Sequence, residues 1–441
     1  MVFARPFLAV CALALGCAQS PYDRAWLGRA LVARTGFATR DEAHARPDDA
    51  PLPPGVSRAA LTDDAAVATA LWNNAAFNAE LSQLGFARAD LAEAGMLPNP
   101  TLALLLPLGP RQIESWLAWP IEALWQRPRR VEAAQRDVAR VAQTLVQTGL
   151  DLARDVRLAH ADAVLARGRA TLRAEAAQVM TSLAELAQAR LRRGDIGAPE
   201  AAAAALDAGT AQELSLRARA EVTLADARLR LLLGLTDRGA FTPVADPPPL
   251  DAAEGLDGLL EVAMSARPDV RAAELGMEAA GARLGWERTR IFGLVARVDG
   301  FGPAPLGPAE VTARVGVQAT LPLFHQNQFG IGRAEAEVER AAWRYAQVRQ
   351  QVVAEVTSAQ AQAEQLASSL RAWREAVRPA AEEAARGAER SLAQGESSWI
   401  AVLDATRRVV EVRLREVELE AELRRARALL QRSTGGRRAS R

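Results

Sequence analysis

The side chains that most often carry chemistry are few in this sequence and widely separated. Histidine occurs at His44, His160 and His325, and cysteine at Cys11 and Cys17. Zinc sites need such residues at short, regular spacings, so the sequence predicts no metal centre. It also contains no glycine-rich phosphate loop and no nucleophile motif. We therefore expect no cofactor and no catalytic constellation, and an enzyme is not predicted.

Cys17 is the reactive residue whose position indicates a role. Arg5 precedes an apolar run from Phe7 to Leu15, which is too short to cross a bilayer as a helix. This pattern predicts a signal peptide over residues 1–17, of the lipoprotein type with Cys17 as the lipidated residue. Ala14 stands where such a signal usually has leucine, so ordinary cleavage near Ala18 remains the alternative.

Composition and charge exclude other classes of protein. The 54 basic and 53 acidic residues give a net charge of +1, which provides no general attraction for nucleic acid. Removal of a signal peptide would leave one cysteine at most, so no disulfide is expected. Alanine, leucine, arginine and glutamate are abundant, and all four favour helices. A long helical protein stabilised by packing is therefore predicted.

The sequence is organised as two similar halves. Residues 18–60 are rich in proline, aspartate and arginine and predict an extended tether. Residues 61–246 and 247–432 each predict a helix, two short strands and a long helical hairpin, offset by about 200 residues. A disordered basic tail is expected over residues 433–441. Such a repeat indicates internal duplication.

The long helical runs have the spacing of a coiled coil. Gly194 and Gly395 lie near the middle of the two runs and predict a turn that makes each run an antiparallel hairpin. A free coiled-coil rod would leave the strands without a role. The first run shows apolar residues at alternating steps of three, four and seven, namely Val131, Val138, Val141, Leu145, Leu152, Val156, Ala159 and Ala163.

The predicted strands alternate between apolar and polar residues. In the segment from Val311 to Leu321, every second residue is apolar, and Leu294 to Asp299 follows the same rule. Strands of about 9 to 11 residues suit a tilted crossing of a bilayer. We then expect the apolar face to meet lipid and Arg297 and Arg314 to line water. A small soluble sheet has the same alternation and remains the alternative.

Four motifs, in this order along the chain, resemble the TolC-like outer-membrane efflux protein family. The resemblance covers residues 60–432 and includes a hint of the branch that serves metal-cation pumps. The motifs are Leu97-Pro98-Asn99-Pro100, Arg267-Pro268-Asp269-Val270, Leu321-Pro322-Leu323-Phe324 with the following Gly332-Arg333-Ala334-Glu335, and Leu403-Asp404-Ala405-Thr406-Arg407.

This resemblance implies an α+β membrane protein that works as a homotrimer. Three chains would give four transmembrane strands each to a 12-stranded barrel in the outer membrane, because four strands cannot close a barrel. Their hairpins would form a helical barrel in the periplasm. Such channels receive cargo from an inner-membrane pump through a periplasmic adaptor protein. Their barrels contact outer-membrane lipid.

The resemblance also places the functional residues. Asp404 matches a position near the periplasmic gate, with Arg407 or Arg408 as its partner; a solvated helix charge is the alternative. Gly194 and Gly395 would mark the tips where the adaptor docks, although plain capping turns would look the same. The expected function is passive conduction of metal cations, drugs or polypeptide. The competing interpretation is a periplasmic coiled-coil lipoprotein that forms no channel.

Overall fold

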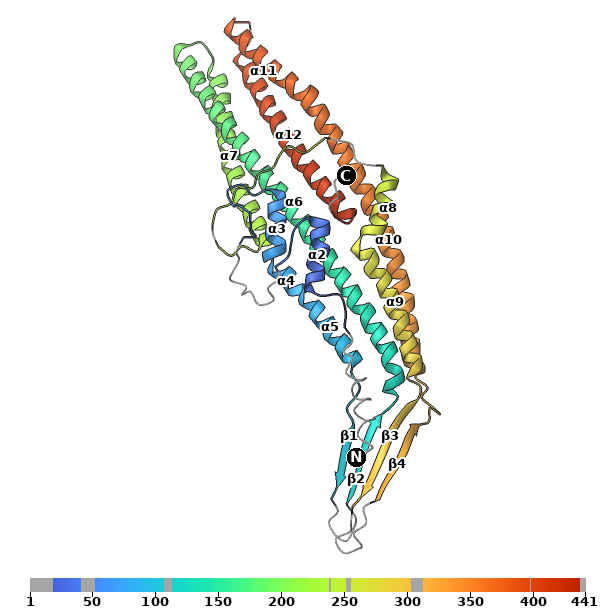
Figure 1. The fold of residues 1–441 in the computed structure, drawn as a ribbon. Coiled ribbons are helices and arrows are strands. Elements are labelled where there is room, and N and C mark those ends of the chain that lie inside the picture. The colour runs from blue at the N-terminus through green and yellow to red at the C-terminus, as the bar shows by residue number, and fades with distance from the viewer. Residues whose placement is uncertain are drawn as a thin grey trace. The chain divides into compact units, whose positions relative to one another are not determined.

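The computed structural model describes residues 19–40, 52–106, 113–237, 239–250, 255–302, 312–396 and 398–436. The chain divides into two compact units, and both sequence halves contribute to each (Figure 1). The first unit contains the described parts of Met1–Leu27, Glu80–Leu145 and Pro268–Gln350. The second contains those of Gly28–Ala79, Val146–Arg267 and Gln351–Arg441.

The first unit carries a four-stranded antiparallel sheet in the order β1-β2-β3-β4. Its central pair, β2 with β3, joins the first half of the sequence to the second. The predicted strands are confirmed, with ends that differ by a few residues. They are β1 (Thr101–Leu105), β2 (Glu114–Pro120), β3 (Gly293–Phe301) and β4 (Thr312–Thr320).

The register of the sheet separates an apolar face from a polar one. Val298 pairs with Leu117 and Val315, and Asp299 pairs with Trp116 and Arg314. Directly paired residues point to the same face, and neighbours along a strand point to opposite faces. The Val298 face is open to solvent in the single chain, with Val315 85% exposed. The alternation in the sequence therefore identified both faces.

Helices α5 (Ser82–Gly95) and α9 (Pro268–Thr289) belong to the first unit, with the first parts of α6 (Ala123–Arg193) and α10 (Gln328–Ala372). Arg136 and Arg283 tie α6 to α9 through Glu278 and Asp137. Arg127 Nε donates to the Gly95 carbonyl over 2.7 Å, which satisfies an oxygen left free at the end of α5.

The second unit contains two long helical hairpins. The first pairs α6 with α7 (Ala198–Leu233), and the second pairs α11 (Arg378–Ala393) with α12 (Trp399–Ser433). Between α10 and α11 lies η1, a π-helical segment over Trp373–Val377. Short helices α3 (Asp63–Asn73), α4 (Ala75–Glu80) and α8 (Leu256–Ala266) precede the strands or long helices.

Apolar packing between helices follows the predicted seam. Leu366 and Leu370 of α10 pack against Leu419 and Leu423 of α12 in one buried cluster. Several seam residues are only half-buried, because an ideal helix drifts relative to a seven-residue repeat. The buried seam residues of α6 are Val138, Leu145, Val156, Ala159 and Ala163, and the half-buried ones are Val131, Val141 and Leu152.

We expected residues 18–60 to be an extended tether. This prediction is wrong for Arg24–Thr35, which form helix α2. Asp23 begins this helix by accepting a hydrogen bond from the Trp26 backbone amide, 2.6 Å away. Leu27 and Leu31, one turn apart, are fully buried. Apolar spacing within α2 therefore outweighed the polar composition of the longer segment.

The disordered tail expected over residues 433–441 is wrong for its first residues. Ser433 ends α12, and both Ser433 and Thr434 are buried. Thr434 Oγ1 donates to the Leu430 carbonyl over 3.1 Å, which satisfies one free oxygen of the last helical turn. Residues 437–441, like the predicted signal peptide, lie outside the described residues.

Candidate functional site

The ends of the two hairpins are joined by an ion pair between Arg407 of α12 and Asp207 of α7. Asp207 keeps only 14% of its side chain exposed, whereas half of the Arg407 side chain is exposed. The pair links a helix of the first sequence half to one of the second. It therefore holds the two hairpins of one chain together close to their tips.

Asp404 has a different partner from the one predicted first. Its carboxylate lies 2.9 Å from the Arg408 guanidinium, one turn further along α12. Both side chains are more than half exposed. Of the two candidate partners, Arg408 is thus the one that contacts Asp404, and Arg407 turns away to Asp207. An exposed pair of this kind stabilises a helix only slightly.

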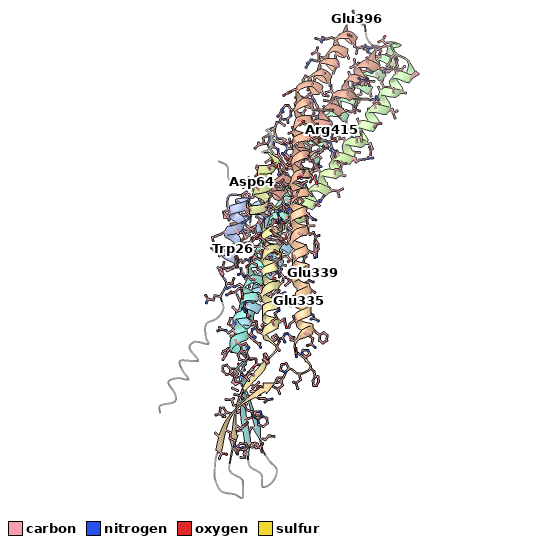
Figure 2. The ribbon with its side chains drawn as sticks, turned by 90° about the vertical axis from the view of Figure 1, so that its right-hand side faces the viewer. Trp26, Asp64, Glu335, Glu339, Glu396 and Arg415 are labelled. Atoms are coloured by element: carbon pink, nitrogen blue, oxygen red, sulfur yellow. The ribbon has the colours of Figure 1, made fainter. Side chains whose placement is uncertain are left out.

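The two hairpin tips have the same backbone structure. Gly194 and Gly395 have φ angles of 82° and 77°, in the left-handed region that glycine adopts without strain. After each, the next amide reaches back five residues: Asp195 donates to Arg190 and Glu396 donates to Ser391. This is the Schellman arrangement that ends many helices. Glu396 lies at the tip of the second hairpin (Figure 2).

An apolar cluster packs the two tips against each other. Trp399 and Leu403 of α12 lie against residues of both α6 and α7, and Arg190 stacks over the Trp399 ring at 5.4 Å. The cluster and the Arg407–Asp207 pair together fasten α12 to the first hairpin. Its buried members are Met180, Ala187, Ala204, Trp399 and Leu403.

Charged residues gather on the polar face of the sheet. Arg297 donates to Asp299 over 2.5 Å, and its guanidinium lies 5.3 Å from the Trp116 ring. Arg314 pairs in register with Asp299 and stacks on Phe301. Both arginines predicted to line water therefore lie on the face opposite the exposed valines.

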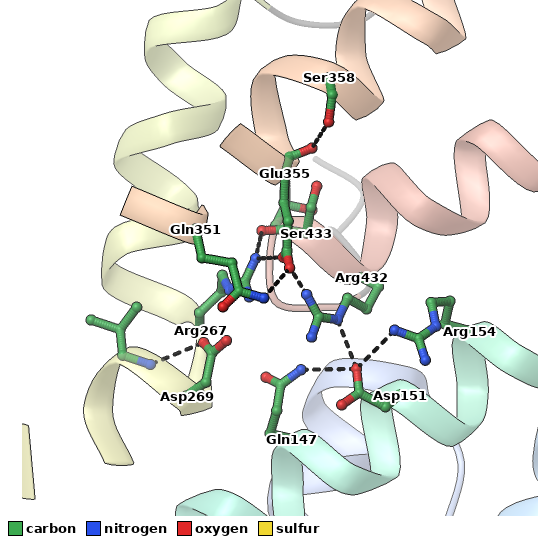
Figure 3. A network of polar contacts seen from close by, with 12 residues as sticks. Gln147, Asp151, Arg154, Arg267, Asp269, Gln351, Glu355, Ser358, Arg432 and Ser433 are labelled. Atoms are coloured by element: carbon green, nitrogen blue, oxygen red, sulfur yellow. Dashed lines mark hydrogen bonds and ion pairs between the residues drawn. The ribbon is translucent and has the colours of Figure 1, made fainter. Parts of the chain in front are cut away.

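A chain of ion pairs joins four helices of the second unit (Figure 3). Arg267, which ends α8 and is fully buried, lies 2.7 Å from Glu355 of α10. Arg432 near the end of α12 contacts both Glu355 and Asp151 of α6, the latter over 2.7 Å. Arg154 also reaches Asp151, at 3.4 Å. The network therefore anchors the C-terminal end of α12, the end far from the hairpin tip at Gly395.

The network holds Glu355 in its charged form. Burial is the largest influence and by itself raises the pKa of Glu355. Hydrogen bonds from Arg267 and Gln351 and the charges of Arg432 and Arg267 together outweigh burial, so the net pKa is lowered. The arginine of the Arg267-Pro268-Asp269 motif thus has a structural task at the base of the second hairpin.

Comparisons with known proteins agree with the predicted resemblance. Residues 259–436 match the family described as outer membrane efflux protein. The cobalt-zinc-cadmium resistance protein CzcC of Cupriavidus metallidurans is 24% identical over 381 residues, covering 83% of this chain and 88% of CzcC. The nickel-cobalt-cadmium resistance protein NccC of Alcaligenes xylosoxydans is 28% identical over 60% of this chain and 61% of NccC.

The fold is also that of a solved transmembrane channel. The crystal structure of CusC superposes with a TM-score of 0.72, covering 91% of this chain and 98% of CusC at 17% identity. The resemblance to the TolC-like outer-membrane efflux proteins is confirmed. The matched family model lies within the second sequence half, which contains the Arg267 motif and Asp404.

The two histidines among the described residues, His160 and His325, lie in different surroundings. His160 is buried, and its Nε2 donates to the Leu61 carbonyl over 2.8 Å. Burial lowers the pKa of His160, which favours the neutral ring. His325 is exposed beside Phe329. Within the described ranges, no three His, Cys, Asp or Glu side chains are arranged to hold a metal ion. Over the same ranges, no helix has both the length and the apolar character to cross a bilayer.

Two structural features were not predicted from the sequence, the Asp207–Arg407 ion pair and the π-helical segment. Asp207 carries no local signal, because its partner Arg407 is 200 residues away. The π-helical segment did have a signal: Pro379 stands inside a run of strong helix formers. Cys17 and both connectors between paired strands fall outside the described residues.

Proposed function

We propose that this chain is one subunit of an outer-membrane efflux channel that conducts metal cations passively from a periplasmic adaptor and an inner-membrane pump. The exposed apolar face of the sheet carries the proposal. Val315 and Val317 present a hydrophobic surface that no element of the described part of the chain covers, and the charged face of Arg297 and Arg314 lies behind it. Lipid on one side and water on the other would satisfy both faces.

A homotrimer follows from the edges of the sheet. Strands β1 and β4 each have one unpaired edge in the described sheet, and unpaired backbone groups are too costly in lipid. Three chains would pair these edges and form a 12-stranded barrel with Arg297 and Arg314 facing its lumen. Their hairpins would continue as a periplasmic helical tube.

The tips supply the proposed gate and docking sites. Three copies of Asp404 around a narrow bore would form a carboxylate ring that favours cations. The Arg407–Asp207 pair would hold the tips closed, and the turns at Gly194 and Gly395 would meet the adaptor. The metal-resistance relatives CzcC and NccC support metal cations as cargo.

The proposed membrane attachment includes Cys17. A signal peptide over residues 1–17 would direct export, and a lipid on Cys17 would fix the chain to the outer membrane. The Cys17→Ser variant should lose incorporation of radiolabelled palmitate. Continued labelling of that variant would contradict the assignment of Cys17.

Purified protein tests the channel directly. We expect a detergent-solubilised trimer by light scattering and stepwise cation conductance in planar bilayers. The Val315→Asp variant should fail to insert, because it places a charge on the lipid face, whereas Gln318→Asp on the polar face should insert normally. A water-soluble monomer without conductance would support the alternative, a coiled-coil lipoprotein that forms no channel.

A further inference from the structure

Three arginines of helix α10 have no partner in the described part of the chain. Arg333, Arg340 and Arg344 follow one another at steps of seven and four, which puts them on one face of the helix, near the end that leads from the sheet. All three side chains are exposed, and none forms a hydrogen bond or ion pair with another described residue. By contrast, Arg136 and Arg283 of the same unit each hold a carboxylate. We call the three free arginines the basic stripe.

The other side of α10 faces its own chain. Glu335 accepts a hydrogen bond from Arg288 of α9 over 3.2 Å, and the Tyr345 hydroxyl lies 3.4 Å from Glu274 of the same helix. The Arg349 guanidinium lies over the Tyr345 ring, on this side as well. Because one side of α10 is occupied by α9, the basic stripe points away from the chain that carries it.

Two aromatic side chains accompany the basic stripe. Phe329 lies four residues before Arg333 and is 76% exposed, and Trp343 lies three residues after Arg340 and is 70% exposed. These spacings place both rings on the face of the stripe. Large aromatic residues and arginine are the residue types enriched where proteins meet, so this face of α10 has the composition of an interface.

Helix α5 carries the complementary charges. Phe86, Asp90 and Glu93 follow one another at steps of four and three and share one face of that helix. All three are exposed, Phe86 by 63%. Neither carboxylate has a side-chain partner among the described residues. Arg88, the one basic residue of α5, lies on the opposite side, so this face is acidic and partly aromatic.

The order of the strands places the two helices at opposite edges of the sheet. Helix α5 leads into β1 and α10 leaves β4, and these are the two strands with a free edge (Figure 1). Strand β1 runs away from the helices and β4 runs towards them. Pairing β4 of one subunit with β1 of the next would therefore be antiparallel, like the other pairings of the sheet. Helix α10 and the α5 of the next subunit would then lie side by side.

The charges also match in height. Arg333 is five residues from the start of α10 at Gln328, and Asp90 is five residues from the end of α5 at Gly95. Both residues therefore lie about 7.5 Å along their helices from the ends nearest the sheet. A helix pair that starts from neighbouring strands brings the Arg333 guanidinium level with the Asp90 and Glu93 carboxylates.

We propose that the basic stripe of α10 docks on the Phe86–Asp90–Glu93 face of α5 in the next subunit, with Arg333 bound to the two carboxylates. The proposal rests on the proposed homotrimer and names the side chains that join its subunits. A membrane surface fits the stripe less well. Arg344 lies about 24 Å along α10 from Gln328, whereas the headgroup layer on one side of a bilayer is only about 5 to 8 Å thick.

A cross-link of zero length tests this contact, because the sequence contains no lysine. Arg333→Lys adds a single side-chain amine, which a carbodiimide joins only to a carboxylate in direct contact. Full-length trimers of this variant in detergent should give cross-linked dimers and trimers on a denaturing gel, several-fold above the wild type. Adding Asp90→Asn and Glu93→Gln should abolish the product. Arg349→Lys is the matched control on the α9 side of the same helix and should stay at the wild-type level.

The outcomes separate this contact from the channel function. Trimers that conduct cations but give no cross-link in Arg333→Lys would overturn the contact and leave the channel function standing. A cross-link that survives removal of both carboxylates, or that Arg349→Lys gives equally, would also overturn it. Loss of the cross-link in vesicles containing phosphatidylglycerol would assign the basic stripe to the lipid surface instead. Cross-linked subunits in a protein that does not conduct would support the contact and contradict the channel, and a monomer in detergent would contradict both.

Discussion

Arg407 of α12 forms its ion pair with Asp207 of α7, across the two halves of the sequence, and not with its near neighbour Asp404. The pair therefore joins two hairpins, whereas the Asp404–Arg408 pair lies within one helix. Breaking the first should separate helices. Breaking the second should leave their arrangement unchanged. This difference makes the two arginines a matched set for testing the gate.

Replacing Arg407 with alanine should open the proposed channel more often. A partly exposed ion pair contributes about 0.2 to 1 kcal/mol. Three copies acting together would then shift the ratio of open to closed channels by roughly 3-fold to 150-fold. Single-channel recording of open probability measures this shift directly.

Arg408→Ala is the control for that experiment, because Arg408 is adjacent and equally basic but pairs within α12. We expect its open probability to stay at the wild-type level. Charge reversal of both partners, Arg407→Asp with Asp207→Arg, should restore closure. Equal effects of Arg407→Ala and Arg408→Ala would argue against a latch between the hairpins.

Most of the fold could be predicted from local patterns. Alternation at Val315 and Val317 identified a strand and its apolar face, and Gly194 and Gly395 identified both turns, because each signal acts over a few residues. Helix α2 was missed since only Leu27 and Leu31 mark it within a polar segment. The partner of Arg407 could not be predicted for another reason. Contacts between helices that are distant in sequence depend on how those helices pack.

Removing the Asp404 charge should weaken cation selectivity. A threefold ring of carboxylates raises the local concentration of cations, so Asp404→Asn should lower the cation-to-anion permeability ratio roughly several-fold. Reversal potentials in a salt gradient provide the measurement. Glu389→Gln, an exposed change on α11, is the control and should leave the ratio intact. The same ratio in Asp404→Asn and wild type would remove Asp404 from the conduction path.

Neutralising Glu355 should destabilise the base of the second hairpin at neutral pH. Glu355→Gln leaves the fully buried Arg267 without its carboxylate, and we expect a loss of about 2 to 4 kcal/mol. Glu364→Gln, an exposed change on the same helix where Glu364 accepts from Gln360, should cost little. Thermal unfolding midpoints of the two variants give the comparison.

The pH dependence of that loss has a definite sign. The pKa of Glu355 is lower in the folded chain than its ordinary value of 4.5. Its contribution is therefore fully present above about pH 4.5 and disappears as the pH falls through the folded value. The midpoints of wild type and Glu355→Gln should converge in acid. A constant difference between them down to pH 3 would contradict the assigned network.

Gly234 should tolerate substitution less well than Gly194, although both end helices with a positive φ. At Gly234, where φ is 66°, an added Cβ would lie 2.5 Å from the Asn73 carbonyl oxygen at the end of α3. At Gly194 nothing lies within 4 Å of that Cβ. Gly194→Ala should therefore cost only the left-handed backbone, about 1 to 2 kcal/mol. Gly234→Ala adds a clash with backbone that cannot rotate away, for a total of roughly 2 to 5 kcal/mol. Thermal unfolding of both variants decides the matter: equal midpoints would show that α7 and α3 do not meet as closely as the structure indicates.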